Sequence, residues 1–463
     1  MLRIYNSLGK KKEEFKPIEE NKVKFYVCGP TVYDVAHLGH GRSAVCFDVI
    51  RKYFEYKGYD VHFVSNYTDI DDKMINRANE EGISVSELAE RIIPEYKFDY
   101  EKLGVKPPSV QPKATEHIDQ IIKLIEELEE KNMVYTLPDG IYFDINAFPG
   151  YGKLSGQNLE DLRMGARVEV NELKRNPYDF AVWKFRKEGE PYYESPWGEG
   201  RPGWHIECSA MAYEHLGSPF DIHGGGLDLT FPHHECEIAQ SEGALGENSF
   251  AKYWIHNGFI NVDGEKMSKS LNNFSTLKAI FENYSPTVVR FMLLQTHYRN
   301  PIDFSQVLLT QSRSALDRIH GFVSILNSYS TTDGESNENI LKFITNSKAS
   351  FEDAMDDDFD TSGALGSLFD FIKKVNIYLA DNPLTTKSRE AILEFLQSID
   401  RVLGIIFITT SDLDADIEEL IKERNQAREN RDFETSDRIR DELLEKGIVL
   451  EDTPSGTIWK KKN

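Results

Sequence analysis

Residues 23–65 contain the pattern that most restricts the fold of this chain: a strand, an amphipathic helix and a second strand in close succession. Residues 23–27 and 59–65 are rich in β-branched and aromatic side chains, as buried strands are. Between them, apolar side chains recur every four residues and share one helix face: Val45, Val49 and Tyr53. Strands joined by a helical crossover run parallel. The pattern predicts an α/β fold built on a Rossmann-like, doubly wound parallel sheet.

The same sheet is expected to return later in the chain, near residues 220–223 and 254–260. Ligands of such a sheet bind beyond the carboxyl ends of its strands, and Cys28 directly follows the first strand. Proline and glycine punctuate residues 105–200, which predicts an insertion with its own helix and several short strands.

Beyond residue 310 the apolar pattern becomes helical, as the spacing of Leu365, Phe369 and Ile372 indicates. We therefore expect a Rossmann-like domain at 1–310, an α-helical bundle at 311–410 and a small C-terminal domain at 411–463. The run from Asp356 to Asp358 is most simply a solvated turn or the start of a helix.

Bulk composition excludes several classes of protein. A chain of 463 residues is long enough for more than one core. It contains no run of about 18 apolar residues, so no membrane span is predicted. The first residues do not resemble a secretory signal, and four cysteines do not suggest a disulfide framework, so we expect a cytoplasmic protein. The net charge of −23 leaves a local nucleic-acid surface possible, because only the contacted patch must be basic.

Two histidines, His37 and His40, are three residues apart at the expected start of the crossover helix. This spacing directs both imidazoles the same way, Gly39 leaves room for a nucleotide, and a helix N-terminus favours negative charge. The alternative interpretation is a pair of surface histidines.

Two lysines, Lys266 and Lys269, follow a turn that contains Gly264. Cations on a glycine-hinged loop are suited to neutralising a departing pyrophosphate. Taken alone, the lysine segment would be interpreted as a solvated loop. Together with the histidine pair it indicates ATP-driven formation of an adenylate.

Cysteine, histidine and glutamate residues provide candidate ligands for a metal ion. His233 and Glu237 are four residues apart and share a helix face, with His234 expected to point elsewhere. Cys236 is a rival for Glu237, whereas Cys46 reads as a buried, inert cysteine. Two thiolates, an imidazole and one further ligand suit zinc. The predicted set is Cys28, Cys208, His233 and Glu237.

Three glycines, Gly224 to Gly226, follow a predicted strand and precede the proposed metal-binding helix. Glycine allows main chain to approach a ligand closely. Asp228, just beyond them, could accept a hydrogen bond from a ribose hydroxyl or an ammonium group.

Taken together, these motifs resemble class I aminoacyl-tRNA synthetases, and within them the cysteinyl-tRNA synthetase family. The likeness extends over the whole chain, from the segments at 28–34 and 37–40, through 203–209, 223–228, 231–237 and 266–270, to the C-terminal stretch 423–428. It implies that L-cysteine is first activated by ATP to cysteinyl-adenylate with release of diphosphate. The cysteinyl group then passes to the 3′ end of tRNA-Cys, and AMP is released.

The resemblance also implies roles for the ATP-site residues. His37 and His40 would act on the α/β-phosphates and Lys266 and Lys269 on the β/γ-phosphates, with Mg²⁺ bound to ATP. The ATP site would further include Gly39 and Gly224, Gly225 and Gly226. The region at 261–310 corresponds to the lysine loop and a stem-contact region.

One Zn²⁺ per chain would allow the protein to distinguish cysteine from serine. Size and polarity alone distinguish similar side chains by roughly 10- to 200-fold, less than the roughly 10⁴-fold that translation needs. A thiol ionises far more readily than a hydroxyl and is the better zinc ligand. A site open to the substrate sulfur could therefore reject serine without an editing domain.

The resemblance also implies residues that bind the amino acid and the tRNA. Trp204, Thr68 and Gly29 would line the amino-acid pocket, and Asp228 would hold the ammonium group. In the tRNA-binding part, unpaired anticodon bases could stack on an aromatic ring or bond to charged groups. The candidates are Arg428, Phe433, Asp437 and Asp452, although a plain charged helix pair is the alternative. A monomer is expected.

Two rival functions are considered. A cysteine ligase of the mycothiol pathway resembles this family but transfers cysteine to an amino-sugar and lacks a full anticodon-binding tail, so residues 411–463 favour the synthetase. A non-catalytic zinc RNA-binding module would not require Lys266 and Lys269.

Overall fold

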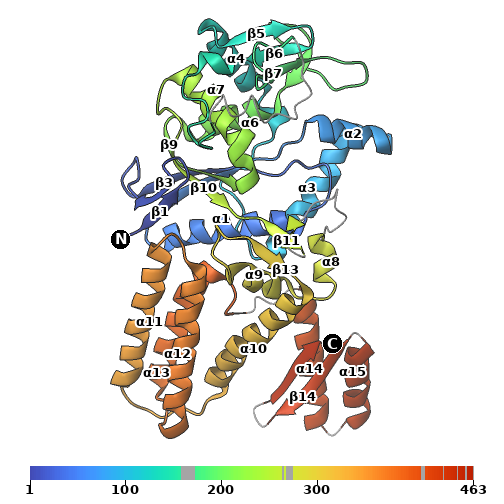
Figure 1. Ribbon diagram of the computed structural model, residues 1–463. Helices are drawn as coiled ribbons and strands as arrows, with labels where there is room; N and C mark the ends of the chain where they lie inside the picture. Colours follow the sequence, from blue (N-terminus) through green and yellow to red (C-terminus); the bar gives the residue numbers. More distant parts are fainter. Residues whose placement is uncertain are drawn as a thin grey trace.

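The computed structural model describes residues 1–157, 173–262, 265–266, 275–407, 412–430, 432–445, 447–453 and 456–461 (Figure 1). The predicted strand–helix–strand unit is present as β3 (Lys22–Val27), α1 (Leu38–Tyr56) and β4 (Asp60–Ser65). β3 and β4 pair in parallel, in the register that places Val23 opposite Val61. The apolar face of α1 is buried, as its four-residue spacing predicts.

A four-stranded parallel sheet in the order β10–β9–β3–β4 forms the centre of the N-terminal domain. Its other strands are β9 (Phe220–Gly226) and β10 (Ala251–Asn257), both parallel to their neighbours. α1 covers one face, and α6 (Trp204–Leu216) and α7 (Glu235–Leu245) cover the other (Figure 1). The predicted Rossmann-like, doubly wound fold class is confirmed.

The pleat of β3 decides which side chains reach which face of this sheet. Successive side chains of a strand point to opposite faces. Phe25 and Val27 pack in the core on the α1 side. Tyr26 and Cys28 pack instead with side chains of α6 and α7. Cys28 is thereby directed toward the layer that carries Cys208 and Glu237.

An inserted unit lies above the parallel sheet in Figure 1. After α2 (Asp72–Glu81) and α3 (Val85–Lys102), the chain forms α4 (Ile118–Glu130). A separate antiparallel sheet follows in the order β5–β6–β7–β8, with the strands Val134–Leu137, Gly140–Phe143, Phe180–Phe185 and Gly200–Pro202. It has its own buried cluster around Leu128, Phe143 and Trp183. The predicted insertion, with one helix and short strands, is present.

A small three-stranded sheet, in the order β12–β11–β13, connects the parallel sheet to the helical part. Its strands are Ile260–Val262 (β11), Glu265–Lys266 (β12) and Ile302–Phe304 (β13). Among the described residues between β12 and β13, the chain forms α8 (Leu277–Phe281) and α9 (Pro286–Leu294).

The rest of the chain is mainly helical. The bundle consists of α10 (Gln306–Ser328), α11 (Glu338–Asp356), α12 (Thr361–Asp381) and α13 (Thr386–Leu403). The C-terminal part follows with α14 (Asp412–Glu429), α15 (Phe433–Glu445) and the hairpin of β14 (Ile448–Thr453) and β15 (Gly456–Lys461). A separate buried cluster around Ile421, Ile439 and Leu443 holds it together. Among the helices of the described ranges, none has the length and apolar character needed to cross a membrane.

One expectation about the surface is wrong. Asp358 is fully buried rather than part of a solvated turn. It lies between α11 and α12 at a φ of 68°, and its carboxylate accepts hydrogen bonds from the Tyr298 hydroxyl (2.8 Å) and Arg299 Nε (2.7 Å). It also accepts from the main-chain amide of Tyr5 in the N-terminal hairpin of β1 (Arg3–Asn6) and β2 (Lys11–Glu14). These partners, remote in sequence, replace the water that a surface turn would have.

Candidate active site and metal centre

Four predicted metal ligands meet in one buried cluster on the α6–α7 face of the sheet. The ligand atoms of Cys28, Cys208, His233 and Glu237 all lie within 4.8 Å of one another. Glu237 Oε1 is 3.2 Å from Cys28 Sγ and 3.0 Å from His233 Nε2. Cys28 follows β3 and Cys208 lies on α6. His233 lies in the helical turn just before α7, and Glu237 lies in the first turn of α7. Three separate segments therefore form one donor set.

The protonation of this cluster suits a cation. The Cys28 thiol donates to the Cys208 sulfur and lowers the pKa of Cys208 to about 6. Burial opposes a charge on His233, yet Glu237 and Cys208 outweigh it and raise the pKa of His233 to about 10. Burial likewise opposes ionisation of Glu237, but His223 and His233 hold its pKa well below the usual range. The cluster thus combines two anions, Cys208 and Glu237, with protons on Cys28 and His233, and a divalent cation could replace those protons.

The donor set fits zinc by its chemistry. Two sulfur ligands, one imidazole and one carboxylate are ligand types that zinc accepts, and together they reach the number of a tetrahedral site. All four side chains are buried, with Cys28 the most exposed at 9%. A divalent cation would compensate the negative charge that these groups develop on losing their protons.

Further histidines surround the cluster, and the sequence argument missed them. His223 Nε2 lies 3.1 Å from Glu237 Oε2, and His234 Nε2 lies 4.0 Å from Glu237 Oε1. The expectation that His234 points elsewhere is wrong, because residues three apart on a helix are neighbours as well. His205 Nδ1 is 2.9 Å from His233 Nδ1 and orients that ring. The period-two pattern of β9 could have indicated His223, which shares a face with Asp221 and Gly225.

The two other cysteines lie outside this cluster. Cys236 Sγ is 3.4 Å from the Tyr151 hydroxyl, in the core of the inserted unit. Burial raises the pKa of Cys236, so its thiol stays protonated. Cys46 is buried on α1, and burial raises its pKa to about 12. The geometry therefore places Glu237, and not its rival Cys236, against the other three donors.

The paired histidines form the N-terminus of α1. His37 is the N-cap, and its Nδ1 accepts from the amide of His40, while His40 Nδ1 accepts from the amide of His37. The two rings stack with centroids 3.6 Å apart. Because both Nδ1 atoms accept, each neutral ring carries its proton on Nε2. This cap fixes two Nε2–H donors side by side at the positive end of a helix dipole.

Residues 275–277, which come after the lysine motif in the sequence, contact the same helix end. Main-chain hydrogen bonds join Leu38 N to Ser275 O (3.1 Å) and Leu277 N to Ala36 O (3.0 Å). On the other side of the segment, Lys266 lies on β12 and pairs with Asn261 of β11. Lys269 lies outside the described residues. Residues 275–277 are thus attached directly to the start of the histidine helix.

The glycines predicted to border the amino acid and the nucleotide are required by close packing of the protein itself. A Cβ on Gly29 would lie 1.6 Å from Asn66 O, and one on Gly224 would lie 2.5 Å from the Phe47 ring. A Cβ on Gly225 would lie 2.8 Å from His234, and one on Gly226 would lie 2.5 Å from Asp228 Oδ1. The glycines allow β3, β9 and the metal-binding segment to pack closely.

The residues predicted to line the amino-acid pocket differ in their exposure and in their contacts with the metal cluster. Trp204 stacks on His233 with ring centroids 4.4 Å apart and is 38% exposed. Thr68 is buried and pairs through its main chain with Pro30 and Val32, next to Cys28. Asp228 is exposed and follows β9.

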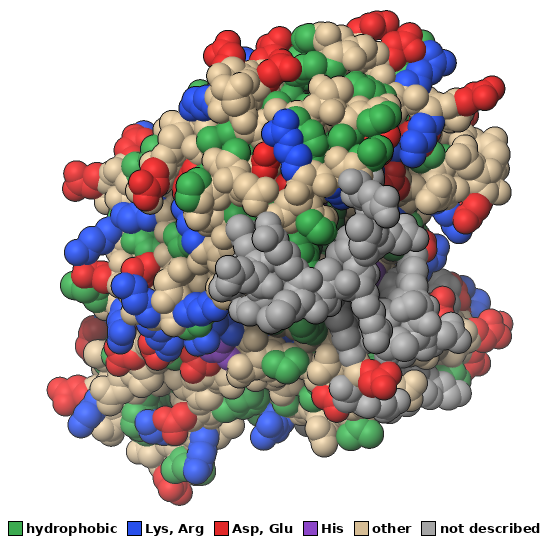
Figure 2. All heavy atoms as spheres, turned by 45° about the horizontal axis from the view of Figure 1, so that its top comes forward, with side chains coloured by type: hydrophobic (Ala, Val, Ile, Leu, Met, Phe, Trp, Pro, Cys, Tyr) green, Lys and Arg blue, Asp and Glu red, His purple; other side chains and the backbone are tan. Residues whose placement is uncertain are grey.

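On the face drawn in Figure 2, acidic and basic side chains are interspersed, and histidine is visible only in narrow recesses.

The predicted anticodon residues lie in the C-terminal part. Arg428 is exposed in the last turn of α14, and Phe433 and Asp437 are exposed at the start of α15. Phe433 is 64% exposed, which is unusual for an aromatic ring in a helix. Asp452 lies on β14.

The fold is similar to that of Mycobacterium tuberculosis methionyl-tRNA synthetase in complex with methionyl-adenylate. The TM-score is 0.64 at 15% sequence identity, over 86% of this chain and 94% of that chain. The family profile described as tRNA synthetases class I (C) catalytic domain matches residues 14–314. Fold and site therefore define a class I aminoacyl-tRNA synthetase.

Two further profiles match later parts of the chain: a DALR domain at 350–407 and a cysteinyl-tRNA ligase anticodon binding domain at 410–459. The cysteine–tRNA ligase of Carboxydothermus hydrogenoformans is 50% identical over 99% of this chain and 100% of that protein. The cysteine–tRNA ligase of Clostridioides difficile is 48% identical over 99% and 100%. The chain belongs to the cysteine–tRNA ligase family, which confirms the resemblance inferred from its motifs.

Proposed function

We propose that this protein joins L-cysteine to tRNA-Cys in two steps, of which the first consumes ATP. A carboxylate oxygen of cysteine attacks the α-phosphorus of ATP, and the bond from that phosphorus to the bridging oxygen breaks, releasing diphosphate. A ribose hydroxyl at the 3′ end of tRNA then attacks the acyl carbon, and AMP leaves. The buried cluster of Cys28, Cys208, His233 and Glu237 carries this proposal, because it suits recognition of a thiol.

We assign one Zn²⁺ per chain to these four side chains. Zinc can accept a fifth ligand, so zinc bound there would supply a soft acceptor for the ionised sulfur of the substrate, for which a hydroxyl is a poor substitute. The ring of Trp204 on His233 and the His205–His233 contact keep the imidazole oriented. These contacts support selection of cysteine over serine at the binding step.

The ATP-site residues act by positioning and by electrostatics. In-line phosphoryl transfer requires few covalent roles from a protein. We assign the two Nε2–H donors of His37 and His40 to the α/β-phosphates, with Gly39 leaving space beside them. Lys266 and Lys269 neutralise the β/γ-phosphates and the departing diphosphate, which leaves with Mg²⁺. The attachment of Ser275 and Leu277 to residues 36–38 supports this joint action.

The other proposed contacts complete the ligand sites. Gly29, Thr68 and Trp204 line the amino-acid pocket, Asp228 receives the ammonium group, and Gly224 to Gly226 border the nucleotide. The bundle at 311–410 and the part at 411–463 bind tRNA. In the latter, Arg428, Phe433, Asp437 and Asp452 are assigned to the anticodon, supported by the exposure of Phe433 and the match at 410–459. The protein acts as a monomer in the cytoplasm, where tRNA is charged.

The C-terminal match also favours tRNA as the acceptor over the amino-sugar of a mycothiol-pathway ligase. The decisive experiment measures ATP–pyrophosphate exchange with each of the twenty amino acids, together with the zinc content of the same preparation. We expect exchange with cysteine, little with serine, and about one zinc per chain. Equal exchange with serine, or active protein without zinc, would contradict the proposal. Charging of tRNA-Cys and of an amino-sugar, measured side by side, separates the two acceptors.

A further inference from the structure

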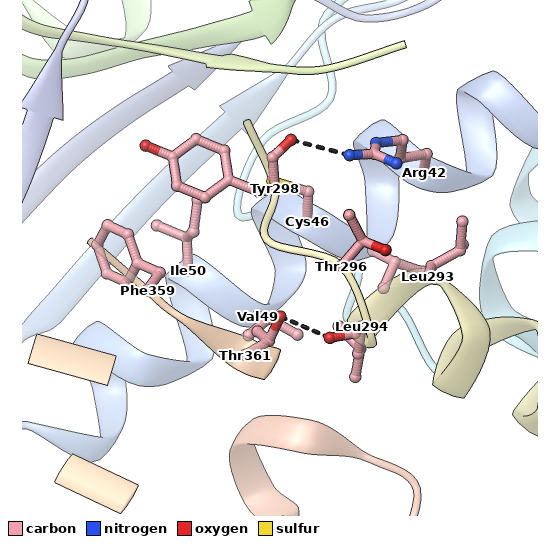
Figure 3. A pocket seen from close by; sticks show the side chains of 11 residues that line it. Arg42, Cys46, Val49, Ile50, Leu293, Leu294, Thr296, Tyr298, Phe359 and Thr361 are labelled. Atoms are coloured by element: carbon pink, nitrogen blue, oxygen red, sulfur yellow. Dashed lines mark hydrogen bonds between the residues drawn. The ribbon is translucent and has the colours of Figure 1, made fainter. Parts of the chain in front are cut away.

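Tyr298 contacts two separate parts of the protein through two different groups. Its carbonyl oxygen accepts from Arg42 Nη2 (3.0 Å) and from the amide of Gly258 (2.8 Å). Its hydroxyl donates to Asp358 Oδ1 (2.8 Å). Figure 3 shows Tyr298 between Arg42 of α1 and Phe359, which follows Asp358. One residue thus joins α1 and the start of β11 to the connection between α11 and α12.

The carbonyl side of this connection leads to the proposed ATP site. Arg42 lies two residues after His40 on α1, and it also donates to the carbonyl of Asn300. Gly258 precedes β11, which pairs with the strand that carries Lys266. A Cβ on Gly258 would lie 2.7 Å from Asn300 O, so the two main chains are in close contact. The backbone at 298–300 therefore determines the positions of both ATP-binding segments.

The hydroxyl side leads to the helical bundle. Asp358 is buried, and its second oxygen accepts from Arg299 Nε at 2.7 Å. Burial, with the Asp358 charge adding to it, raises the pKa of Tyr298, so the hydroxyl keeps the proton that it donates. Thr361, at the start of α12, donates to Leu294 O at the end of α9 (2.7 Å; Figure 3).

A small cavity lies inside this junction. A cavity of about 20 Å³ lies between α1, the 293–298 segment and the start of α12, lined by Arg42, Cys46, Tyr298, Phe359 and Thr361 among others (Figure 3). Such a space is about large enough for one water molecule. The hydrogen bonds of Tyr298 and Arg299 therefore add to the packing of buried side chains in holding the segment beside this space.

We propose that Asp358 is a positioning residue for adenylate formation, holding Tyr298 and Arg299 so that the main chain at 298–300 sets the spacing of α1 and β11. The tRNA-binding bundle is thereby mechanically connected to the residues that contact ATP. The inference rests on the proposed function, since it assigns the consequence to ATP use. It concerns a residue that contacts neither ATP nor cysteine.

The test compares Asp358→Asn with Asp400→Asn. Asparagine tolerates the φ of 68° at position 358, but its amide nitrogen would face Arg299. Asp400 is a matched control, because its carboxylate accepts from the amides of Ile405, Ile406 and Phe407 and none of these contacts reaches residues 298–300. We expect Asp358→Asn to raise KM for ATP by roughly 3- to 30-fold in cysteine-dependent exchange, with KM for cysteine within twofold of wild type. Asp400→Asn should leave both KM values unchanged.

Tyr298→Phe tests the same connection without changing charge. The double variant Tyr298→Phe with Asp358→Asn should resemble the stronger single variant, because both changes break one connection. An unchanged KM for ATP in Asp358→Asn, an equal rise in Asp400→Asn, or additive effects in the double variant would each overturn the inference. ATP-induced thermal stabilisation provides a readout without activity. Absence of exchange in the wild type would instead refute the proposed function. The thermal stabilisation by ATP, compared between wild type and the variants, would still test whether Asp358 acts on the ATP site through Tyr298 and Arg299.

Discussion

Replacement of Cys28 by serine is the most direct test of the metal centre. The change removes one of two sulfur donors and replaces it with a hydroxyl, a poor ligand for zinc at neutral pH. Four side chains form the donor set. If the roughly 10–16 kcal/mol of a structural zinc site is divided equally over four ligands, loss of one costs about 2.5–4 kcal/mol. This corresponds to an increase of roughly 70- to 900-fold in the Kd for zinc.

The assay is competition with a metal chelator, followed by zinc analysis and by calorimetric binding of cysteine. Cys236→Ser is a matched control, since its sulfur contacts Tyr151 in the core of the inserted unit and not the cluster. We expect Cys28→Ser to lose zinc at chelator concentrations that leave wild type loaded, and to bind cysteine more weakly in parallel. Cys236→Ser should keep both properties.

Retention of zinc by Cys28→Ser with a Kd within about threefold of wild type would refute the reasoning. Equal loss in Cys236→Ser would refute it as well, because the geometry separates the two sulfurs. If zinc affinity fell and cysteine affinity did not, the ion would be structural and selection of the thiol would require another explanation.

Three further predictions concern the rest of the chain. Lys269→Ala should lower the rate of cysteine-dependent exchange by at least about 100-fold at unchanged melting temperature. Lys278→Ala, on the exposed side of α8, should leave that rate unchanged. Equal exchange rates in the two variants would contradict the role assigned to Lys269. Truncation after Phe407 should spare exchange and abolish tRNA charging, and parallel loss of both would make the C-terminal part structural. Burial, with Glu95 adding to it, raises the pKa of Asp99 from 3.8 to about 6, so the folded state holds a proton that the unfolded chain loses in this window. The contribution of Asp99 to the free energy of unfolding therefore falls as pH rises from 3.8 to 6, and Asp99→Asn should stabilise the protein by about 1–2 kcal/mol at pH 7.5 and by less at pH 4.5. An equal gain at both pH values in denaturant melts would be inconsistent with this shift.

The parts of the structure that follow from local periodicity could be predicted from the sequence. The four-residue spacing on α1 and the alternation along β3 place Val49 in one core and Cys28 in the other. Helical spacing likewise brings Glu237 beside His233, 3.0 Å apart. In each case the geometry of a single element determines which side chains share a face.

Residues whose environment depends on distant segments could not be predicted in this way. Asp358 lies in a run of acidic residues typical of a surface turn, and its buried partners Tyr298 and Arg299 are 60 and 59 positions away. His223 and His205 join the metal cluster only because β9, α6 and α7 pack together. No local pattern specifies such contacts between elements. They arise from packing in three dimensions.

The separation of the cluster along the chain has a consequence for biogenesis. Cys28 and Glu237 are 209 positions apart, so a growing polypeptide cannot offer the complete donor set until α7 has been synthesised. Loading with the proposed zinc ion would therefore be a late event in maturation.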